Sequence, residues 1–473
     1  MNINKDKVMS GLLWGLFAEL LNKVSPLLIA LIAARALASK DFGLAQVSLW
    51  GLDYILFFVA CGVGEFGPLY LAKNAKNRED YAEFLSSAFL VRLCFGGIVW
   101  ALMQLPHMTE GFSDQSRQYW MLLSFLGIAA SIFDASSLLI ATHRTHVIAI
   151  VNIIVRISGI ALAALFVRSP GDSLIFLTIT LGTGFMTALG TSAVAWRYFG
   201  YQSPSRKCMT LLLAAAPVFV TRVILLLSLE RFDLFTLYVL GRFQDLGVYV
   251  APLRMVLALL PIVTMSSQVF LADILSQNSK DKTSHKHLWL AVRWCILVFT
   301  PIIFIFWIFG GDLCLRLLGD SYALGNASSL LGIFALGALA QACLQIIGYQ
   351  IFLVQGRIWQ MNVIVFISLT FGLIIFVFFG QDFSLIQFAT VSVFCKCLAA
   401  VLLILTSLRQ IRPIPLDLLR VSAPLVLFAS AEIVFNYGLG LSPWFALLVT
   451  LPVIPMFWRA ELRHFLRFMR WNR

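Results

Sequence analysis

The chain has 473 residues, of which 60% are apolar and only 12% are charged, and its formal net charge is +12. Soluble globular proteins carry about 25% charged residues, so this composition excludes an ordinary soluble enzyme. The basic residues are spread through short loops and form no patch with interleaved aromatic residues, which argues against a nucleic-acid partner.

A membrane-spanning helix needs about 20 mostly apolar residues, and the long unbroken apolar runs exclude the alternating pattern of barrel strands. We therefore predict an all-α polytopic membrane protein with about 14 transmembrane helices and no room for a soluble catalytic domain. The helices are predicted over residues 10–34, 44–72, 83–105, 118–141, 146–168, 173–198, 210–230, 246–272, 288–311, 327–353, 359–380, 384–408, 417–438 and 442–459.

The loops between these helices differ in their content of lysine and arginine, which are retained on the cytoplasmic side. One set of loops, together with both chain ends, holds 21 basic residues and the other set holds 7. The smaller set consists of Arg35, Lys40, Arg117, Arg168, Arg231, Arg242 and Arg316. This bias predicts cytoplasmic N- and C-termini.

A short motif occurs twice in the sequence, and the two copies are separated by six predicted membrane-spanning helices. Lys40-Asp41-Phe42-Gly43-Leu44 is echoed by Gln244-Asp245-Leu246-Gly247-Val248, and Arg144 in one loop is echoed by Arg357 in another. An even number of crossings preserves orientation, so we predict two parallel six-helix lobes, residues 1–200 and 201–410, followed by two helices and a basic cytoplasmic tail in residues 411–473. The alternative is chance similarity of short turns.

Charged side chains inside the predicted spans are expensive in lipid and are expected to line a shared polar cavity. Guanidinium groups suit pyrophosphate through bidentate hydrogen bonds, which makes Arg92, Arg156, Arg222 and Arg254, assisted by Lys23, candidates for binding a diphosphate. Structural pairing, for example of Arg92 with Asp134, is an equally weighted alternative for any single arginine.

Buried carboxylates titrate or bind cations readily, so the carboxylates inside the spans are candidates for proton or sodium coupling. These candidates are Asp53, Glu65, Asp134 and Glu432. Glu65 lies in Gly62-Val63-Gly64-Glu65-Phe66-Gly67-Pro68, where a proline-kinked packing site is the alternative. We predict no metal site and no cofactor.

The two corner motifs, with Arg254 and the stretch Arg316-Leu317-Leu318-Gly319-Asp320-Ser321-Tyr322, resemble the polysaccharide-transporter branch of the multidrug/oligosaccharidyl-lipid/polysaccharide (MOP) exporter superfamily. More narrowly, the chain resembles Wzx-type O-antigen flippases. The resemblance covers essentially the whole chain. It implies two lobes around a cationic cavity in the bacterial inner membrane, alternating access, and export of an undecaprenyl-diphosphate-linked glycan to the periplasmic leaflet.

The predicted function is therefore that of a flippase for a surface-polysaccharide repeat unit, not an enzyme, with membrane lipids, a polysaccharide polymerase and other assembly proteins as partners. A lipid II flippase is one alternative, because that branch also has fourteen helices. A cation-coupled drug exporter is less favoured, since seven cations outnumber five carboxylates inside the predicted spans. A membrane glycosyltransferase or polymerase is the alternative of another class, but the longest predicted outer loop, 106–117, is short for it.

Overall fold

A computed structural model describes residues 24–75, 77–104, 114–142, 144–260, 283–319, 322, 327–348, 352 and 357–408. Ten helices in these ranges are long and apolar enough to cross a membrane, and each overlaps a predicted span. The described residues contain no strand. The predicted all-α polytopic membrane fold is thus confirmed, while the predicted helices at 417–438 and 442–459 lie outside the described residues.

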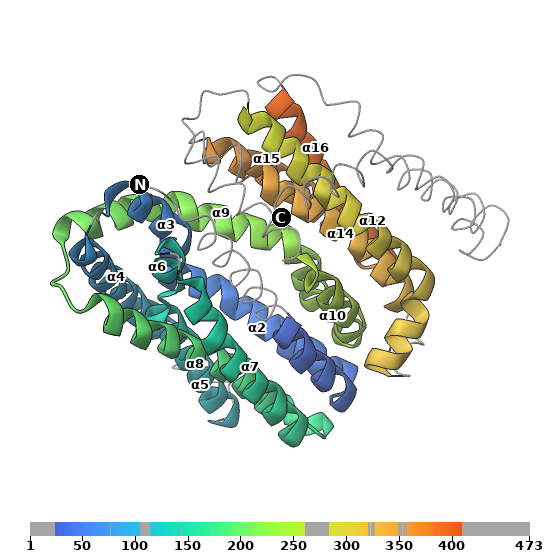
Figure 1. The fold of residues 1–473 in the computed structure, drawn as a ribbon. Helices are drawn as coiled ribbons and strands as arrows, with labels where there is room; N and C mark the ends of the chain where they lie inside the picture. The colour runs from blue at the N-terminus through green and yellow to red at the C-terminus, as the bar shows by residue number, and fades with distance from the viewer. Residues whose placement is uncertain are drawn as a thin grey trace, which may run out of the picture. The chain divides into compact units, whose positions relative to one another are not determined.

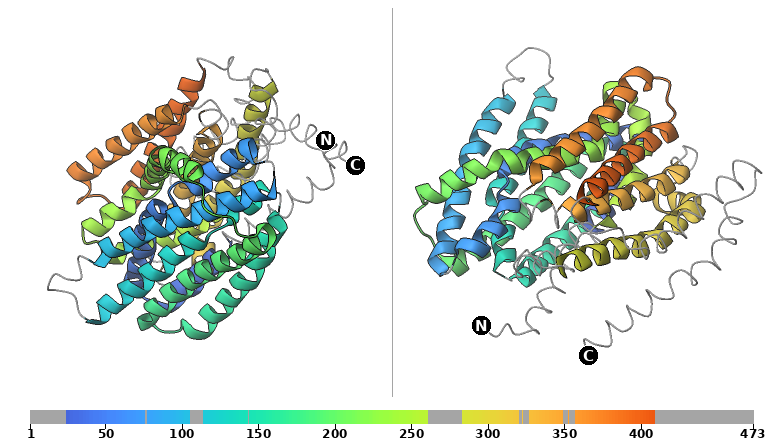
Figure 2. Two further views of the ribbon diagram at one scale, coloured as in Figure 1. Left: turned by 90° about the vertical axis from the view of Figure 1, so that its left-hand side faces the viewer. Right: turned by 90° about the horizontal axis from the view of Figure 1, so that it is seen from above.

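The chain forms two compact units, Met1–Ile262 and Val263–Arg473. The first unit contains α2 (Ser39–Ala60), α3 (Val63–Asn74), α4 (Arg78–Gln104), α5 (Asp114–Phe133), α6 (Ser136–Ala141), α7 (Thr145–Phe166), α8 (Ser173–Phe199), α9 (Arg206–Val239) and α10 (Phe243–Leu257). One hydrophobic core of this unit lies between α3, α4, α6, α7, α8 and α9 and includes Phe84, Leu138 and Leu212. The pair α4 and α5 is visible side by side in Figure 2.

The second unit contains α12 (Thr283–Leu318), α14 (Ala327–Ile347), α15 (Ile358–Phe379) and α16 (Leu385–Leu408). Helix α14 packs on both α12 and α16, and α16 also packs on α15. The predicted boundary between six-helix lobes at residue 200 remains a prediction. In the structure α9 and α10, which follow that boundary, share a compact unit with α2.

The two copies of the corner motif meet where α2 and α10 begin, and the two helices lie side by side in Figure 1. Gly43 and Gly247 each occupy the fifth position of their helix. A Cβ added to Gly43 would lie 2.6 Å from the backbone nitrogen of Gly247, and one added to Gly247 would overlap the carbonyl oxygen of Ser39. The echoed glycines therefore allow the backbones to touch. Both turns therefore lie at the same end of this helix pair.

The second echo is a shared backbone turn. Arg144 precedes α7 with φ −99° and ψ 35°, and Arg357 precedes α15 with φ −100° and ψ 30°. The Arg144 N–H donates to the Leu139 carbonyl at 2.8 Å and the Arg357 N–H donates to the Phe352 carbonyl at 2.7 Å. Each hydrogen bond spans five residues, so the two units use the same local geometry at the echoed positions.

Two predicted helices are interrupted. The span predicted over 44–72 divides into α2 and α3 at Cys61 and Gly62, which have φ of 48° and 66°. This left-handed turn falls at the start of the glycine-rich stretch. The span predicted over 118–141 divides into α5 and α6 at Asp134 and Ala135. The second break was not predicted, because no glycine or proline marks it.

Helix α9 is longer than predicted. The expected helix ended at residue 230, with Arg231 in an outer loop, because Glu230, Arg231 and Asp233 interrupt the apolar run. The structure continues α9 to Val239. Arg231 pairs with Asp53 of α2 and Asp233 accepts a hydrogen bond from Tyr249 of α10, so these two polar side chains do not end the helix.

Candidate functional site

One face of α2 presents three polar or aromatic side chains to α9 and α10. Gln46, Trp50 and Asp53 are spaced four and three residues apart, which places them on one side of the helix. Gln46 and Trp50 are both 1% exposed. The close approach of α2 and α10 at Gly43 and Gly247 brings this face within reach of the arginines opposite.

Arg254 of α10 is held by this face through neutral groups. Its Nη2 donates a hydrogen bond to the Gln46 Oε1 at 2.6 Å. The centre of its guanidinium lies 4.6 Å from the centroid of the Trp50 ring, a cation–π distance. Arg254, a predicted diphosphate-binding residue, is therefore ordered by these two contacts, and neither of them is with a carboxylate.

Arg231 of α9 lies against the other end of the same face. Its Nη1 donates to the Asp53 Oδ2 at 2.7 Å, its Nε is 3.8 Å from the Glu230 Oε1, and its guanidinium is 5.1 Å from the Trp50 centroid. The Arg231 side chain is 11% exposed and that of Asp53 is 39% exposed. Asp53, a predicted coupling residue, is thus the counter-ion of an arginine that the sequence placed in a loop.

Two residues after Arg231 on α9, Asp233 is fully buried and accepts a hydrogen bond from the Tyr249 hydroxyl of α10. Its other carboxylate oxygen accepts from the Leu234 N–H at 2.9 Å. Sequence reasoning missed Gln46, Trp50, Arg231 and Asp233. Continuation of α9 past residue 230 would have placed Arg231 and Asp233 on a helix, and this was the signal for them. No sequence signal marked Gln46 or Trp50.

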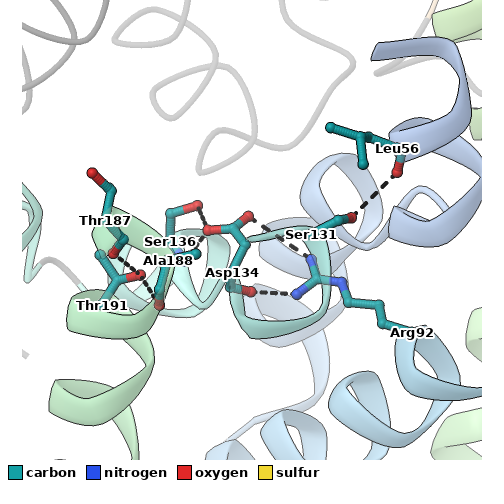
Figure 3. Close-up of polar contacts among 8 residues, drawn as sticks. All are labelled: Leu56, Arg92, Ser131, Asp134, Ser136, Thr187, Ala188 and Thr191. Atoms are coloured by element: carbon teal, nitrogen blue, oxygen red, sulfur yellow. Dashed lines mark hydrogen bonds and ion pairs between the residues drawn. The ribbon is translucent and has the colours of Figure 1, made fainter. Parts of the chain in front are cut away.

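Arg92 of α4 binds the interruption between α5 and α6 (Figure 3). Its Nη1 donates to the backbone carbonyl of Asp134, and its Nη2 is 4.0 Å from the Asp134 carboxylate. That carboxylate also accepts from the Ser136 N–H at 3.0 Å and the Ser136 hydroxyl at 2.6 Å. Arg92 therefore pairs with Asp134, which is the structural alternative that the sequence analysis considered for this arginine.

A small cavity borders this pair. Val63 of α3, Phe84 and Arg92 of α4, and Asp134 and Ser137 near the break contribute to its lining. The Asp134 side chain is 38% exposed. Asp134, another predicted coupling carboxylate, therefore stabilises the break between α5 and α6 and also lines the cavity.

The other predicted site residues lie elsewhere. Arg156 of α7 is half-buried and its Nη1 donates to the Thr183 hydroxyl of α8 at 3.3 Å, while Arg222 of α9 is 1% exposed. Arg92, Arg156 and Arg254 contact different partners, so the predicted set is distributed through the first unit. Lys23 and Glu432 lie outside the described residues, as does the side chain of Glu65, whose backbone belongs to α3.

Within the ranges that the structure describes, no group of three or more His, Cys, Asp and Glu side chains is placed to hold a metal ion. The chemistry that these helices present is instead that of ordered guanidinium groups. Some are matched by carboxylates and some by amides, hydroxyls or an aromatic ring.

No protein-family model and no curated protein sequence matches the chain. Solved structures do. The lipid II flippase MurJ in an inward closed conformation aligns with a TM-score of 0.62 and 14% identity over 97% of this chain and 99% of that one. An inward-facing multidrug resistance MATE family transporter of the MOP superfamily aligns with a TM-score of 0.61 and 14% identity over 82% of this chain and 94% of that one.

A MOP superfamily transporter from Pyrococcus furiosus, whose binding pocket is described as having reverse polarity, aligns with a TM-score of 0.54 and 10% identity over 86% of this chain and 96% of that chain. These identities are low, so the likeness is one of fold. The chain has the fold of MOP superfamily transporters, and it is a multi-pass membrane protein.

Proposed function

We propose that the chain is a flippase that moves an undecaprenyl-diphosphate-linked oligosaccharide, the repeat unit of an O-antigen or another surface polysaccharide, from the cytoplasmic to the periplasmic leaflet of a bacterial inner membrane by alternating access. Its termini are cytoplasmic in this proposal, as the lysine and arginine bias of the loops suggests. A polysaccharide polymerase and other assembly proteins receive the exported glycan.

The observation that carries the proposal is the environment of Arg254. A guanidinium inside a membrane protein needs a partner, and within the described part of the chain Arg254 contacts the Gln46 amide and the Trp50 ring. An anion can replace the amide without breaking an ion pair, and a diphosphate offers bidentate, charge-assisted hydrogen bonds that are stronger than the bond to a neutral amide. Arg231 and Arg92 would each have to leave a carboxylate instead.

Arg156 is the second contact in this proposal, since its described hydrogen bond is also to a neutral group, the Thr183 hydroxyl. Arg222 and Lys23 stay in the proposed set as further cations along the path. To Arg92 we assign the holding of the α5–α6 break, through which it shapes the cavity beside it.

Energy for export comes from the membrane potential in this proposal. Moving a negative charge outward across an inside-negative membrane releases about 2.3 kcal/mol per charge per 100 mV. Asp53 is the first candidate for added proton or sodium coupling, because its carboxylate is partly exposed while it pairs with Arg231. Glu65, Asp134 and Glu432 are further candidates.

Lipid II export is the second candidate function. The lipid II flippase aligns with 97% of this chain, whereas the multidrug transporter aligns with 82%. Alignment over nearly the whole length supports a lipid-linked glycan over a drug in this proposal. Both candidate substrates share the polyprenyl diphosphate, so Arg254 has the same role in each.

Transfer of fluorescent lipid-linked glycans across proteoliposomes tests the proposal, with an O-antigen-type precursor and lipid II compared side by side. We expect wild-type protein to move the former, and Arg254→Ala and Arg156→Ala each to lower the rate about tenfold or more, since a charge-assisted hydrogen bond contributes about 1.5–3 kcal/mol. Arg197→Ala, at the exposed end of α8, is the matched control and should leave the rate unchanged.

Transfer of lipid II alone would select the second candidate. If folded protein moved neither lipid, the flippase proposal would fail. Wild-type rates in the Arg254→Ala and Arg156→Ala variants would remove these two residues from the proposed site and leave the transport proposal standing.

A further inference from the structure

Trp50 lies between two arginines that come from different helices. The guanidinium of Arg254, from α10, is 4.6 Å from the ring centroid, and that of Arg231, from α9, is 5.1 Å away. The indole is 1% exposed, so it meets both cations out of contact with water. Two like charges on one aromatic ring need a reason, because they repel one another in a low-dielectric interior.

The neighbours of Trp50 on α2 treat the two arginines differently. Asp53, three residues on, accepts from Arg231 at 2.7 Å and neutralises it. Gln46, four residues back, accepts from Arg254 at 2.6 Å and adds no charge. An indole face attracts a cation through its quadrupole and likewise adds no negative charge. Among the described residues, the side chain of Arg254 is therefore held by two neutral contacts, whereas Arg231 is paired with a carboxylate.

The carboxylates of Asp53 and Glu230 are the groups that compete for that charge. Both contact Arg231, whose guanidinium touches the same ring as Arg254. Asp53 lies three residues beyond Trp50 on α2, and the Arg254 guanidinium packs against the Trp50 ring. Without it, we expect Arg254 to form an ion pair, and an anion would then have to break that pair in order to bind.

We propose that Trp50 is a positioning residue that keeps Arg254 ordered, and out of an ion pair with Asp53 or Glu230, for an anionic diphosphate. This inference rests on the proposed function, and it deepens the site of that function by one residue. Trp50 acts through Arg254 and need not touch the ligand. The role requires a flat aromatic face, so phenylalanine should preserve much of it and leucine should not.

Binding of undecaprenyl diphosphate to the purified full chain in lipid nanodiscs tests the inference through a double-mutant cycle. The variants are Trp50→Leu, Trp50→Phe, Arg254→Ala and the double variant Trp50→Leu with Arg254→Ala. We expect Kd to rise about tenfold in Trp50→Leu and in Arg254→Ala, and less than about threefold in Trp50→Phe. The double variant should bind no more weakly than Arg254→Ala alone, because Trp50 then has nothing to position.

Trp100→Leu is the control, since Trp100 of α4 is 43% exposed and far in sequence from this face. A merely structural role of Trp50 would weaken binding in the Arg254→Ala background as well, and such additive losses would overturn the inference. Equal losses in Trp50→Phe and Trp50→Leu would also overturn it. If Trp50→Leu does not fold, the cycle is measured with Trp50→Phe, whose smaller loss must likewise vanish beside Arg254→Ala.

The two proposals fail in different ways. Absence of binding by wild-type protein would overturn the proposed function, and this inference with it. Binding by wild-type protein that Arg254→Ala weakens and Trp50→Leu does not would overturn the positioning role alone.

Discussion

Arginines inside the first unit differ in what compensates them. Arg231 and Arg92 contact carboxylates, whereas the described contacts of Arg254 and Arg156 are with an amide, an aromatic ring and a hydroxyl. A buried ion pair that is already made tends to hold helices together, because removal of one partner leaves an uncompensated charge. A guanidinium held by neutral groups is better suited to exchange its partner for a ligand.

Asp53→Asn tests whether an arginine paired with a carboxylate, here Arg231, stabilises the fold. We expect the free energy of unfolding to fall by about 2 kcal/mol, because the guanidinium of Arg231 would lose a charge-assisted partner while it stays buried. Unfolding of the detergent-solubilised protein measures this. Asp382→Asn, an equal change at an exposed position, should have no effect.

The same pair provides a coupling measurement. Removing both charges with Asp53→Asn and Arg231→Gln together should cost less than the sum of the two single changes. Losses that add would mean that the 2.7 Å contact does not contribute to stability.

At the scale of elements, the first unit depends on helix contacts and interruptions that use small residues and caps. Gly43 and Gly247 let α2 and α10 touch at their first turns. The Asp134 carboxylate accepts from the N–H of Ser136, the first residue of α6, and Arg92 donates to the Asp134 carbonyl just after α5 ends. Both devices place polar groups inside a membrane protein without leaving the backbone unsatisfied, which lipid does not permit.

Gly247→Ala tests the contact between α2 and α10. The added methyl would overlap the Ser39 carbonyl, so the two helices must separate, although alanine is favoured over glycine in a helix by about 1 kcal/mol. We expect lower thermal stability and a longer distance between spin labels at Lys40 and Gln244, which are both exposed.

Gly51→Ala is the matched control for that change. Gly51 also lies in α2, and a Cβ there would meet nothing within 4 Å, so stability should be unchanged or higher. An unchanged label distance in Gly247→Ala, or equal effects of the two substitutions, would contradict a close glycine contact.

At the scale of the whole molecule, the chain shares its fold both with a multidrug transporter and with a lipid II flippase. The multidrug transporter and the lipid II flippase align with similar TM-scores of 0.61 and 0.62. Fold alone therefore does not select the substrate, and the side chains that face each other must do so. In the function proposed for this chain, those side chains include Arg254, Arg156 and Trp50.

Dependence of transport on membrane potential is the prediction at this scale. An outward-moving diphosphate should cross faster when the proteoliposome lumen that represents the cytoplasm is negative, since each charge gains about 2.3 kcal/mol per 100 mV. Valinomycin with potassium gradients of either sign sets the potential, and the transfer rate is followed by fluorescence. A rate that ignores the potential, or rises when it is reversed, would contradict a net movement of negative charge.

The sequence by itself determined the membrane class, the ten confirmed spans, the echoed corner motifs and the candidate arginines. These are local properties, because hydrophobic length and turn chemistry are legible within a segment of about 20 residues. The extension of α9 and the break at Asp134 were not predicted, since each depends on a side chain from another helix that satisfies the polar groups.

Only the tertiary structure decided which arginines are compensated. Arg231 meets Asp53 across 178 residues of sequence and Arg254 meets Gln46 across 208, and no local pattern distinguishes the two arginines. The direct approach of α2 and α10 at Gly43 and Gly247 brings these partners together. The physical reason is that a charge is compensated by the groups that touch it. Here those groups meet only when helices distant in the sequence pack together.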